Sequence, residues 1–259
     1  MNGAFKSRGV LETIFSHRSI RKYKPEPIPE DHLELILQAG RRAPTDATLH
    51  LWTAIRITDK QLRSRIASLI GQKHVEEAAE FLVFVGDMYR TGRLLEYRGV
   101  EPGKHDCALL LFAAIDAAIA AENMALAAES LGYGTCFIGG VMDAALEIAR
   151  LLDIPEKAVP LFGLTIGVPG EDPPLRPRMP LDILVHENKY RRYTSEDLRR
   201  VYDELAPYSR KRDWLRLLRR YAARGGYFEE RERDLPELFA RQGIDLSTVC
   251  SKMVADPHR

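Results

Sequence analysis

The chain has 259 residues, of which 45% are hydrophobic, enough to bury a substantial core in one large or two smaller domains. Its 38 Lys and Arg residues almost cancel its 37 Asp and Glu residues, and the formal net charge is +1. No overall field therefore draws the chain to nucleic acid or to an anionic membrane, and we expect neither as a partner.

The three cysteines, Cys107, Cys136 and Cys250, are far apart and show no Cys-x-x-Cys spacing. This usage argues against a disulfide framework and against a zinc site, so we expect no metal. A reducing compartment fits such cysteines best. Because the N-terminal residues also lack the apolar core of a secretory signal, we expect a cytoplasmic protein.

The first part of the chain is predicted to alternate helices with short strands. Leu33, Ile36 and Leu37 fall on one stripe of a helix that starts after Pro29, and Asp59 has the type and position of a helix cap. The expected elements are a helix from Glu30 to Arg41-Arg42, a strand over 52–58, a helix over 60–70 that Gly71 ends, and a buried strand over 81–85.

A long apolar helix is predicted from Cys107 to Ala127. Alanine supplies much of its apolar character, and Asp116 and Glu122 interrupt it, so we expect a helix of a folded core rather than a membrane span. A helix that is apolar almost all round must be covered on every side, at the centre of a domain or along a subunit contact. A homodimer is the simpler expectation.

The second half is predicted to hold two more core strands and then to change character. We expect a strand over 135–138, a glycine turn at 139–140, a helix over 143–152 and a strand over 159–168. From Tyr190 onward the chain becomes polar and helical, with Thr194 or Ser195 as a cap.

The segment His17-Arg18-Ser19-Ile20-Arg21 concentrates polar and cationic groups. If it is extended, its period of two puts His17, Ser19 and Arg21 on one face, where all three can meet an anion. Taken alone, the segment fits a phosphate or flavin cradle and a solvated polar loop equally well. A second basic pair, Arg176-Pro177-Arg178, can supply further donors to the same anion.

Several motifs occur in an order that carries a family resemblance. They are His17–Arg21, Arg42-Ala43-Pro44-Thr45, Gly71-Gln72-Lys73-His74, the stretch from Ala128-Glu129-Ser130 through Gly132 and Gly134 to Ile138-Gly139-Gly140, Pro160–Leu164, Arg176–Pro180 and His186-Glu187-Asn188. Over about residues 10 to 190 the chain resembles the nitroreductase superfamily, and within it the oxygen-insensitive nitroreductase and flavin reductase branch that prefers NADPH.

The resemblance implies an α+β fold with a central, mostly antiparallel sheet flanked by helices, in an intertwined homodimer with two FMN sites at the subunit interface. It implies an FMN-binding domain over residues 1–190 and a helical, charge-rich C-terminal extension over 191–259 that packs on the dimer. The cofactor contacts it implies are His17, Arg18, Ser19, Arg21, Thr45, Gln72, Phe137, Ile138, Gly139, Gly140, Arg176 and Arg178.

Within that site, His17 and Ser19 are expected at the phosphate and Arg21 at the redox end of the ring, where a cation favours the reduced flavin. The Gly139-Gly140 turn allows a backbone N–H to approach the ring without a side chain. No catalytic acid or nucleophile is expected, because the flavin carries out the chemistry.

The sequence departs from the family pattern at several places. Asp46–His50 replaces a stretch that usually carries Ser or Asn followed by Leu-Gln, Phe137 stands where tyrosine is frequent, and Arg176 where lysine is usual. The loop expected to grip the 2′-phosphate of NADPH is shortened to Arg210, Lys211 and Arg212, which fit a phosphate clamp and a solvated helix start equally well.

We therefore expect an FMN-dependent NAD(P)H oxidoreductase that passes two electrons by ping-pong hydride transfer to small acceptors: nitroaromatics, quinones or free flavin. NADPH or NADH serves as the donor. Two alternatives stay open. One is a module that binds or senses FMN without turnover, and the other is a different chemistry of the superfamily, such as reductive dehalogenation.

Overall fold

A computed structural model describes residues 7–206 and 214–246 of the chain. By packing, the chain divides into two compact units, residues 1–173 together with 236–259, and residues 174–235. The two units are described separately below. The domains expected over 1–190 and 191–259 are defined by function, and they stay predictions.

The first unit contains the sheet and most of the helices, and the second unit is helical. The elements of the first unit are α1 (Val10–Phe15), α2 (Glu30–Arg41), η1 (Asp46–Thr48), β1 (Trp52–Arg56), α3 (Lys60–Leu69), α4 (His74–Glu77), β2 (Glu80–Asp87), α5 (Tyr89–Tyr97), α6 (Asp106–Ser130), β3 (Gly134–Ile138), η2 (Gly139–Ala144), α7 (Ala145–Leu151) and β4 (Ala158–Gly167). The remaining helices are α8 (Leu181–Leu184), α9 (Ser195–Leu205), α10 (Trp214–Ala222) and α11 (Tyr227–Arg241), and α11 continues past the boundary into the first unit.

The sheet has four strands in the order β1-β2-β4-β3, and every pair of neighbours is antiparallel. Phe84 on β2 lies between Ala54 on β1 and Phe162 on β4, and Gly163 on β4 faces Ile138 on the edge strand β3. The expected α+β fold with an antiparallel sheet is thus confirmed.

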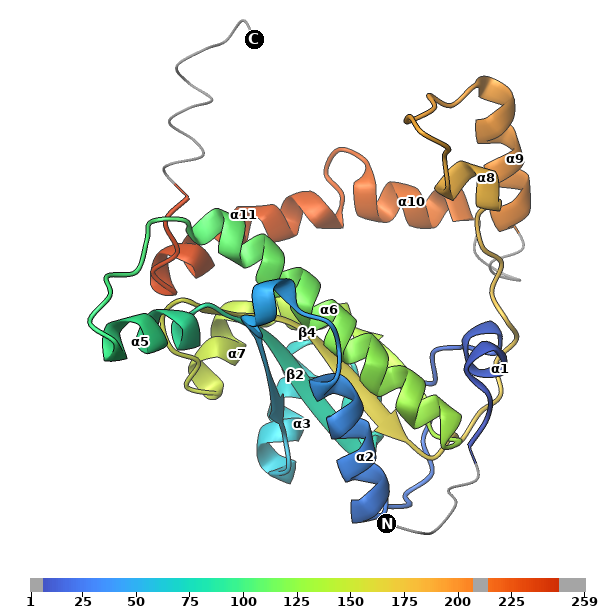
Figure 1. The fold of residues 1–259 in the computed structure, drawn as a ribbon. Coiled ribbons are helices and arrows are strands. Elements are labelled where there is room, and N and C mark those ends of the chain that lie inside the picture. Colours follow the sequence, from blue (N-terminus) through green and yellow to red (C-terminus); the bar gives the residue numbers. More distant parts are fainter. Residues whose placement is uncertain (1–6, 207–213, 247–259) are drawn as a thin grey trace, which may run out of the picture. The chain divides into compact units, whose positions relative to one another are not determined.

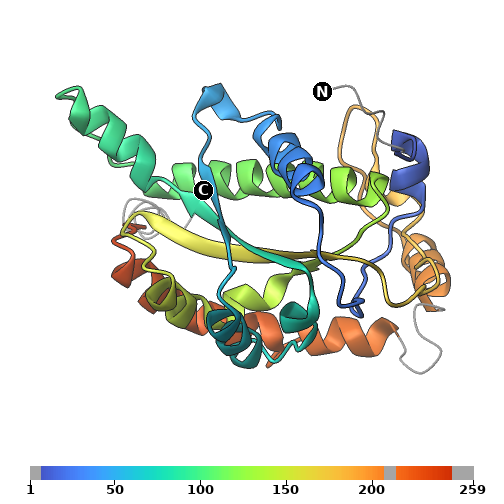
Figure 2. The ribbon, with the colours of Figure 1, turned by 90° about the horizontal axis from the view of Figure 1, so that it is seen from below.

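Strand β2 is buried along its whole length because helices cover both faces of the sheet, as Figures 1 and 2 show. Alternate residues point to opposite faces. Leu82 and Phe84 join a core with α2 and α6, whereas Phe81 and Val83 join a second core with α3 and α7. The sheet therefore forms the middle of three layers.

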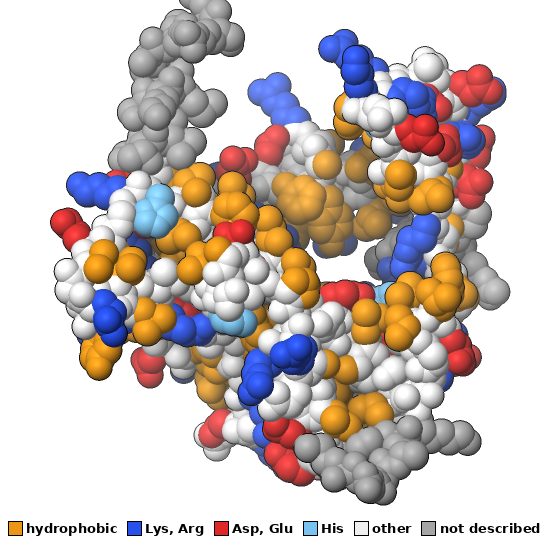
Figure 3. All heavy atoms as spheres, in the orientation of Figure 1, with side chains coloured by type: hydrophobic (Ala, Val, Ile, Leu, Met, Phe, Trp, Pro, Cys, Tyr) orange, Lys and Arg blue, Asp and Glu red, His pale blue; other side chains and the backbone are white. Residues whose placement is uncertain are grey.

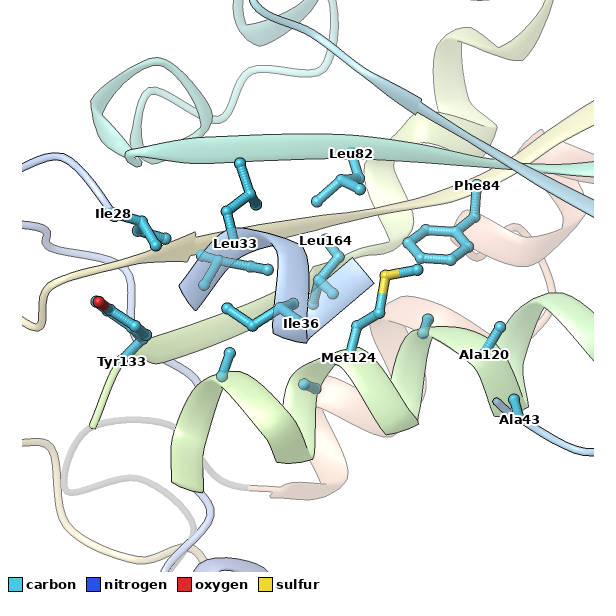
Figure 4. Packing of buried hydrophobic residues seen from close by; sticks show 14 of the residues in the cluster. Ile28, Leu33, Ile36, Ala43, Leu82, Phe84, Ala120, Met124, Tyr133 and Leu164 are labelled. Carbon is cyan, nitrogen blue, oxygen red and sulfur yellow. The ribbon is translucent and has the colours of Figure 1, made fainter. Parts of the chain in front are cut away.

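Helices α2 and α6 pack closely where Gly40 meets Met124, whose side chain is labelled in Figure 4. A Cβ at Gly40 would stand 2.1 Å from the Met124 Cε, so any side chain there would displace the methionine. Met124 in turn lies beneath Phe84 and Ile36 in the same core. This contact fixes α6 against the sheet.

Helix α6 is, among the described residues, the one helix that is long and apolar enough to cross a membrane by length and composition alone. One side of it packs on the sheet and on α2. The other side exposes Leu111, Phe112 and Ile115, and Figure 3 shows hydrophobic side chains gathered over this helix. The sequence predicts that α6 is covered either at the centre of a domain or along a subunit contact. Packing within the domain covers only one side of the helix.

The second unit has a small core of its own, in which Ile183, Val201 and Leu205 pack with Met179 and Trp214. Thr194 caps α9, with its hydroxyl accepting from the Asp197 N–H and the Asp197 carboxylate accepting from the Thr194 N–H. Thr194 was one of the two predicted caps. The Arg191 guanidinium and these Thr194 bonds hold the pKa of Asp197 well below its usual range.

Candidate functional site

The segment from His17 to Arg21 runs along the edge strand β3. The Ile20 N–H donates to the Thr135 carbonyl oxygen at 2.8 Å, and Ser19 forms an isolated parallel bridge with Thr135. Ile20 is buried while Ser19 remains half-buried. The alternation expected of an extended segment is present at these two positions, with Ser19 on the accessible side.

Two further contacts hold this segment in place. The Tyr23 hydroxyl donates to the Ile20 carbonyl oxygen at 2.7 Å and lies 2.8 Å from the Thr165 Oγ1, and burial raises the pKa of Tyr23 above its usual range. Gly134 lies directly under Ile20, where a Cβ would come within 2.5 Å of Ile20 Cγ1. The absence of a side chain at Gly134 therefore lets the segment sit on the strand.

His17 is tied to the core by a carboxylate on α6. Its Nδ1 lies 2.9 Å from the Glu129 Oε1, which also accepts from the Thr135 Oγ1 at 2.5 Å. Glu129 is buried, whereas the His17 side chain is one-third exposed. The imidazole therefore has a buried anchor and an accessible side.

The two arginines of the segment differ in their surroundings. Arg18 pairs with the Asp172 carboxylate and donates to the Pro173 carbonyl oxygen at 3.2 Å. The Arg21 side chain is exposed, and its backbone N–H donates to the Glu171 Oε1 at 2.6 Å. Arg18 therefore forms an ion pair with Asp172 of the same chain, whereas the Arg21 side chain is accessible to a ligand.

Arg21 acts electrostatically on His74, the first residue of α4. Burial lowers the pKa of His74, and the nearby Arg21 guanidinium lowers it further. The Nε2 of His74 is buried without a hydrogen-bond partner among the described residues. Gln72 lies two residues before His74, so the cationic segment and the Gln72 motif are neighbours.

Gln72 reaches the glycine turn that follows β3. Its Nε2 would lie 2.5 Å from a Cβ at Gly140, whereas nothing stands within 4 Å of a Cβ at Gly139. Phe137 is 37% exposed, and its ring contacts that of Phe162 at a tilt of 42°. Ile138 is fully buried, so only its backbone is available to a ligand. The turn therefore presents accessible backbone at Gly139, flanked by an amide and an aromatic ring.

Thr45 belongs to a different cluster, at the loop before β1. Its hydroxyl donates to the buried Asp116 carboxylate on α6, which also accepts from the N–H groups of Asp46 at 3.1 Å and Leu51 at 3.0 Å. Non-glycine residues with positive φ are uncommon, and this loop has them at Ala47, Thr48 and His50. Strain of this kind persists only where surrounding contacts enforce it.

The Thr45 cluster meets α6 near the middle of the helix and the His17 cluster meets it at the C-terminal end, and the two clusters belong to opposite edges of the sheet. Asp116 and Glu129 are 13 residues apart on the helix, or about 20 Å along its axis. Strand β1, which follows the Thr45 loop, and strand β3, which ends at Ile138 just before Gly139, are the two edge strands. Within one chain, the predicted contacts at Thr45 and at the Gly139 turn are therefore separate.

The remaining predicted cofactor contacts lie in the second unit. Arg176 and Arg178 are both exposed, and Arg178 donates weakly to the Arg176 and Pro177 carbonyl oxygens at 3.4 Å. Their contribution to the phosphate stays a prediction. The predicted 2′-phosphate contacts Arg210, Lys211 and Arg212 lie outside the described residues.

Sequence reasoning missed the acids that organise these groups. Glu129 is part of one of the family motifs, but the sequence assigned it no function. Asp116 was interpreted only as a charged residue that interrupts an apolar helix. Glu171 and Asp172 carried no signal at all. A buried acid inside an alanine-rich helix was the one usable clue, since such a group needs hydrogen-bond partners.

The sequence profile of the Nitroreductase family matches residues 14–168, more than half of the chain. That match spans the His17 segment, the Gln72 motif, the glycine turn and all four strands. The chain therefore belongs to the nitroreductase family.

Particular relatives lie within the same branch as the resemblance. The chain is 38% identical over 196 residues to an NADPH-flavin oxidoreductase of Vibrio harveyi, covering 75% of this chain and 80% of that protein. It is 37% identical over 200 residues to an oxygen-insensitive NADPH nitroreductase of Salmonella typhimurium, covering 77% and 82%. The crystal structure of nitroreductase A from Vibrio parahaemolyticus superposes with a TM-score of 0.81 at 35% identity, covering 90% of this chain and 97% of that one.

Proposed function

We propose that the protein is an FMN-dependent NAD(P)H oxidoreductase that transfers two electrons by a ping-pong mechanism to small acceptors such as nitroaromatics, quinones or free flavin. One observation carries the proposal. The cationic segment His17–Arg21 is hydrogen-bonded to the edge strand β3, and the turn that follows this strand has open space at Gly139. Relatives named for NADPH, flavin and nitro-compound reduction support it.

The residues of the first unit fit FMN. A phosphate dianion needs charge-assisted donors, and His17, Ser19 and Arg21 provide them along an accessible edge. The Gly139 backbone is open to a flat ring, and the Gln72 amide beside Gly140 offers polar contacts to its edge. FMN, when bound, supplies hydride acceptance and donation. The chain's own residues bind and orient it, and Arg176 and Arg178 are proposed to complete the phosphate contacts.

The site is proposed to require a second copy of the chain. The Thr45 loop and the Gly139 turn stand at opposite edges of the sheet, so one flavin contacts both only if two chains contribute. Exposed apolar side chains on α6 and α1 offer a matching surface, notably Leu111 and Ile115 on α6 and Leu11 and Phe15 on α1. A homodimer that buries these side chains gains hydrophobic stabilisation.

The hydride donor is proposed from the names of the relatives, and the location from the cysteines and the donor. Relatives named as NADPH-dependent make NADPH the proposed hydride donor, with NADH as a possible substitute. A cytoplasmic protein is proposed because the three cysteines lack the spacing of a disulfide framework and NADPH is an intracellular reductant.

Anaerobic titration of the purified protein tests the proposal. The protein should be yellow, and NADPH should bleach the flavin band with a stoichiometry of one donor per flavin. Bleaching by NADH alone would remove the role proposed for Arg210, Lys211 and Arg212. A yellow protein that neither donor bleaches would leave only the FMN-binding module, and a colourless protein that does not take up added FMN would refute the cofactor.

A further inference from the structure

A buried carboxylate on α6 holds the loop that the proposed site takes from the second chain. Asp116 is 1% exposed. Its Oδ2 accepts from the Thr45 hydroxyl and from the Leu51 N–H at 3.0 Å, and its Oδ1 accepts from the Asp46 N–H at 3.1 Å. Burying a carboxylate is costly unless it is hydrogen-bonded, and these three donors all come from one loop. Asp116 therefore ties both ends of the loop over residues 45–51 to the helix.

The hydroxyl of Thr45 is already used within the chain. It donates its one hydrogen to Asp116 and accepts from the His50 N–H at 2.9 Å. The backbone N–H groups of Ala47 and Thr48 make no hydrogen bond to other described residues, and both residues are exposed. The loop therefore offers backbone donors to a ligand, whereas the Thr45 hydroxyl holds the loop in its shape.

The same turn of α6 lies beside the proposed subunit contact. Phe112 and Ile115 precede Asp116 by four residues and by one residue, and they are 43% and 51% exposed. The far side of the loop is held by α5, where the Arg90 guanidinium donates to the His50 carbonyl oxygen at 2.9 Å. Asp116 thus fixes the loop to the part of α6 on which the proposed homodimer is built.

We propose that Asp116 is a positioning residue for the FMN site of the partner chain: it shapes the Thr45 loop of its own subunit, and that loop completes the cofactor site along β3 of the other subunit. Strand order is the reason, because the Thr45 loop and the Gly139 turn belong to opposite edges of one chain's sheet. The inference rests on the proposed function, since it assumes FMN at the β3 edge and a homodimer. It adds a residue that touches no cofactor and that the expected set of contacts does not contain.

Asp116→Asn perturbs the loop with the smallest change of shape. Whichever oxygen becomes the amide, its N–H groups face a backbone N–H, from Asp46 on one side and from Leu51 on the other. The loop must then move, and the loss of about one hydrogen bond to the cofactor should raise the Kd of FMN in the homodimer about tenfold. Leu33→Ala, which removes a buried side chain near the start of α2, is a destabilised control whose Kd should equal that of the wild type.

Mixed dimers decide whether Asp116 acts across the subunit contact. Ser19→Asp puts a carboxylate at the proposed phosphate position and should abolish the cofactor site of its own chain. The Asp116→Asn and Ser19→Asp chains are co-expressed with different affinity tags, and the mixed dimer is purified through both tags. Its remaining site lies along β3 of the Asp116→Asn chain and receives the loop of the Ser19→Asp chain, in which Asp116 is intact. It should bind one FMN per dimer with the Kd of the wild type.

The reciprocal dimer is the matched control. Both substitutions are placed in one chain, and that chain is paired with a wild-type chain. The remaining site then lies along β3 of the wild-type chain and receives the perturbed loop. Its Kd should be raised about tenfold, as in the Asp116→Asn homodimer.

The two mixed dimers separate the possible roles. A purely structural role of Asp116 would weaken FMN binding in both dimers alike, and a role within its own chain would weaken the first dimer and leave the second unchanged; either result would overturn the inference. An unchanged Kd in the Asp116→Asn homodimer would overturn it as well. A wild type that binds no FMN, or that is a monomer by analytical ultracentrifugation, would instead refute the proposed function.

If Asp116→Asn does not fold, residue-resolved amide hydrogen exchange in the wild type decides. The N–H groups of Asp46 and Leu51 should be protected without FMN, because Asp116 accepts from both. Those of Ala47 and Thr48 should become protected only when FMN binds. Fast exchange at Asp46 and Leu51, or no gain of protection at Ala47 and Thr48 on adding FMN, would contradict the inference.

Discussion

Replacing Asp116 by alanine should loosen the loop over residues 45–51 while leaving the sheet intact. Asp116 is 1% exposed, and its two oxygens accept from the Thr45 hydroxyl and from the N–H groups of Asp46 and Leu51. Asp116→Ala removes all three acceptors at once. The Leu51 N–H is buried, so water cannot replace the lost partner without a movement of the loop.

The size of the effect follows from these bonds. Leaving one buried N–H unsatisfied costs about 1–3 kcal/mol, and each bond to a charged group contributes about 1.5–3 kcal/mol. The buried carboxylate itself carries a desolvation cost of several kcal/mol, which the substitution relieves. The net loss should be about 2–4 kcal/mol. The left-handed backbone of Ala47, Thr48 and His50 should then relax, because Asp116 holds both ends of this loop through Thr45 and Leu51.

Urea denaturation and limited proteolysis measure the two effects. Asp116→Ala should lower the urea midpoint and make the loop a new cleavage site, and Asp116→Asn, which retains one acceptor, should lie between it and the wild type. Glu122→Ala is the matched control, an exposed acid on the same helix whose loss should change the midpoint little. A midpoint for Asp116→Ala equal to that of Glu122→Ala would refute this account of the loop.

Three further predictions concern other parts of the site. Gly134→Ala should destabilise the fold by about 1–3 kcal/mol, because the new Cβ meets the branched side chain of Ile20. Gly139→Ala has space for its Cβ, so it should leave the urea midpoint unchanged while weakening FMN binding. A lower urea midpoint for Gly139→Ala than for Gly134→Ala would contradict this account of the packing. Burial lowers the pKa of His74 in the folded chain, so unfolding takes up a proton below about pH 6.5 and the stability of the fold decreases as the pH falls. His74→Asn should therefore reduce the decrease of the urea midpoint between pH 7 and pH 5. An unchanged pH dependence of the midpoint in this variant would exclude His74 as the source of the decrease. Arg176→Ala combined with Arg178→Ala should yield colourless protein, and stoichiometric FMN in that variant would remove both arginines from the phosphate site.

Local patterns in the sequence predicted most elements of the first unit. The stripe of Leu33 and Ile36, the cap at Asp59 and the end at Gly71 each match an observed feature, and Asp59 accepts from the Leu62 N–H as a cap should. These features depend on neighbouring residues only, so a pattern suffices to find them. Helices α1 and α5 were missed, and both leave their large hydrophobic side chains mostly exposed.

The sequence predicted which residues belong to the candidate site, but it did not predict how they are positioned relative to one another. Motif order pointed to His17, Gln72 and Gly139, which the first unit brings to the β3 edge. The separation of Thr45 from that edge depends on strand order, and the engagement of Arg18 by Asp172 depends on a contact 154 residues away in sequence. Long-range contacts of this kind leave no local pattern.

The most direct test of the central claim separates the two half-reactions. The FMN-loaded protein is reduced anaerobically with one equivalent of NADPH, freed of the nucleotide by rapid gel filtration, and mixed with a quinone or a nitroaromatic in a stopped-flow spectrophotometer. The account predicts that the reduced protein survives filtration and that one equivalent of quinone restores the full flavin band without any nucleotide present. Reoxidation that occurs only while NADPH is still bound, or no reoxidation by any acceptor, would contradict it.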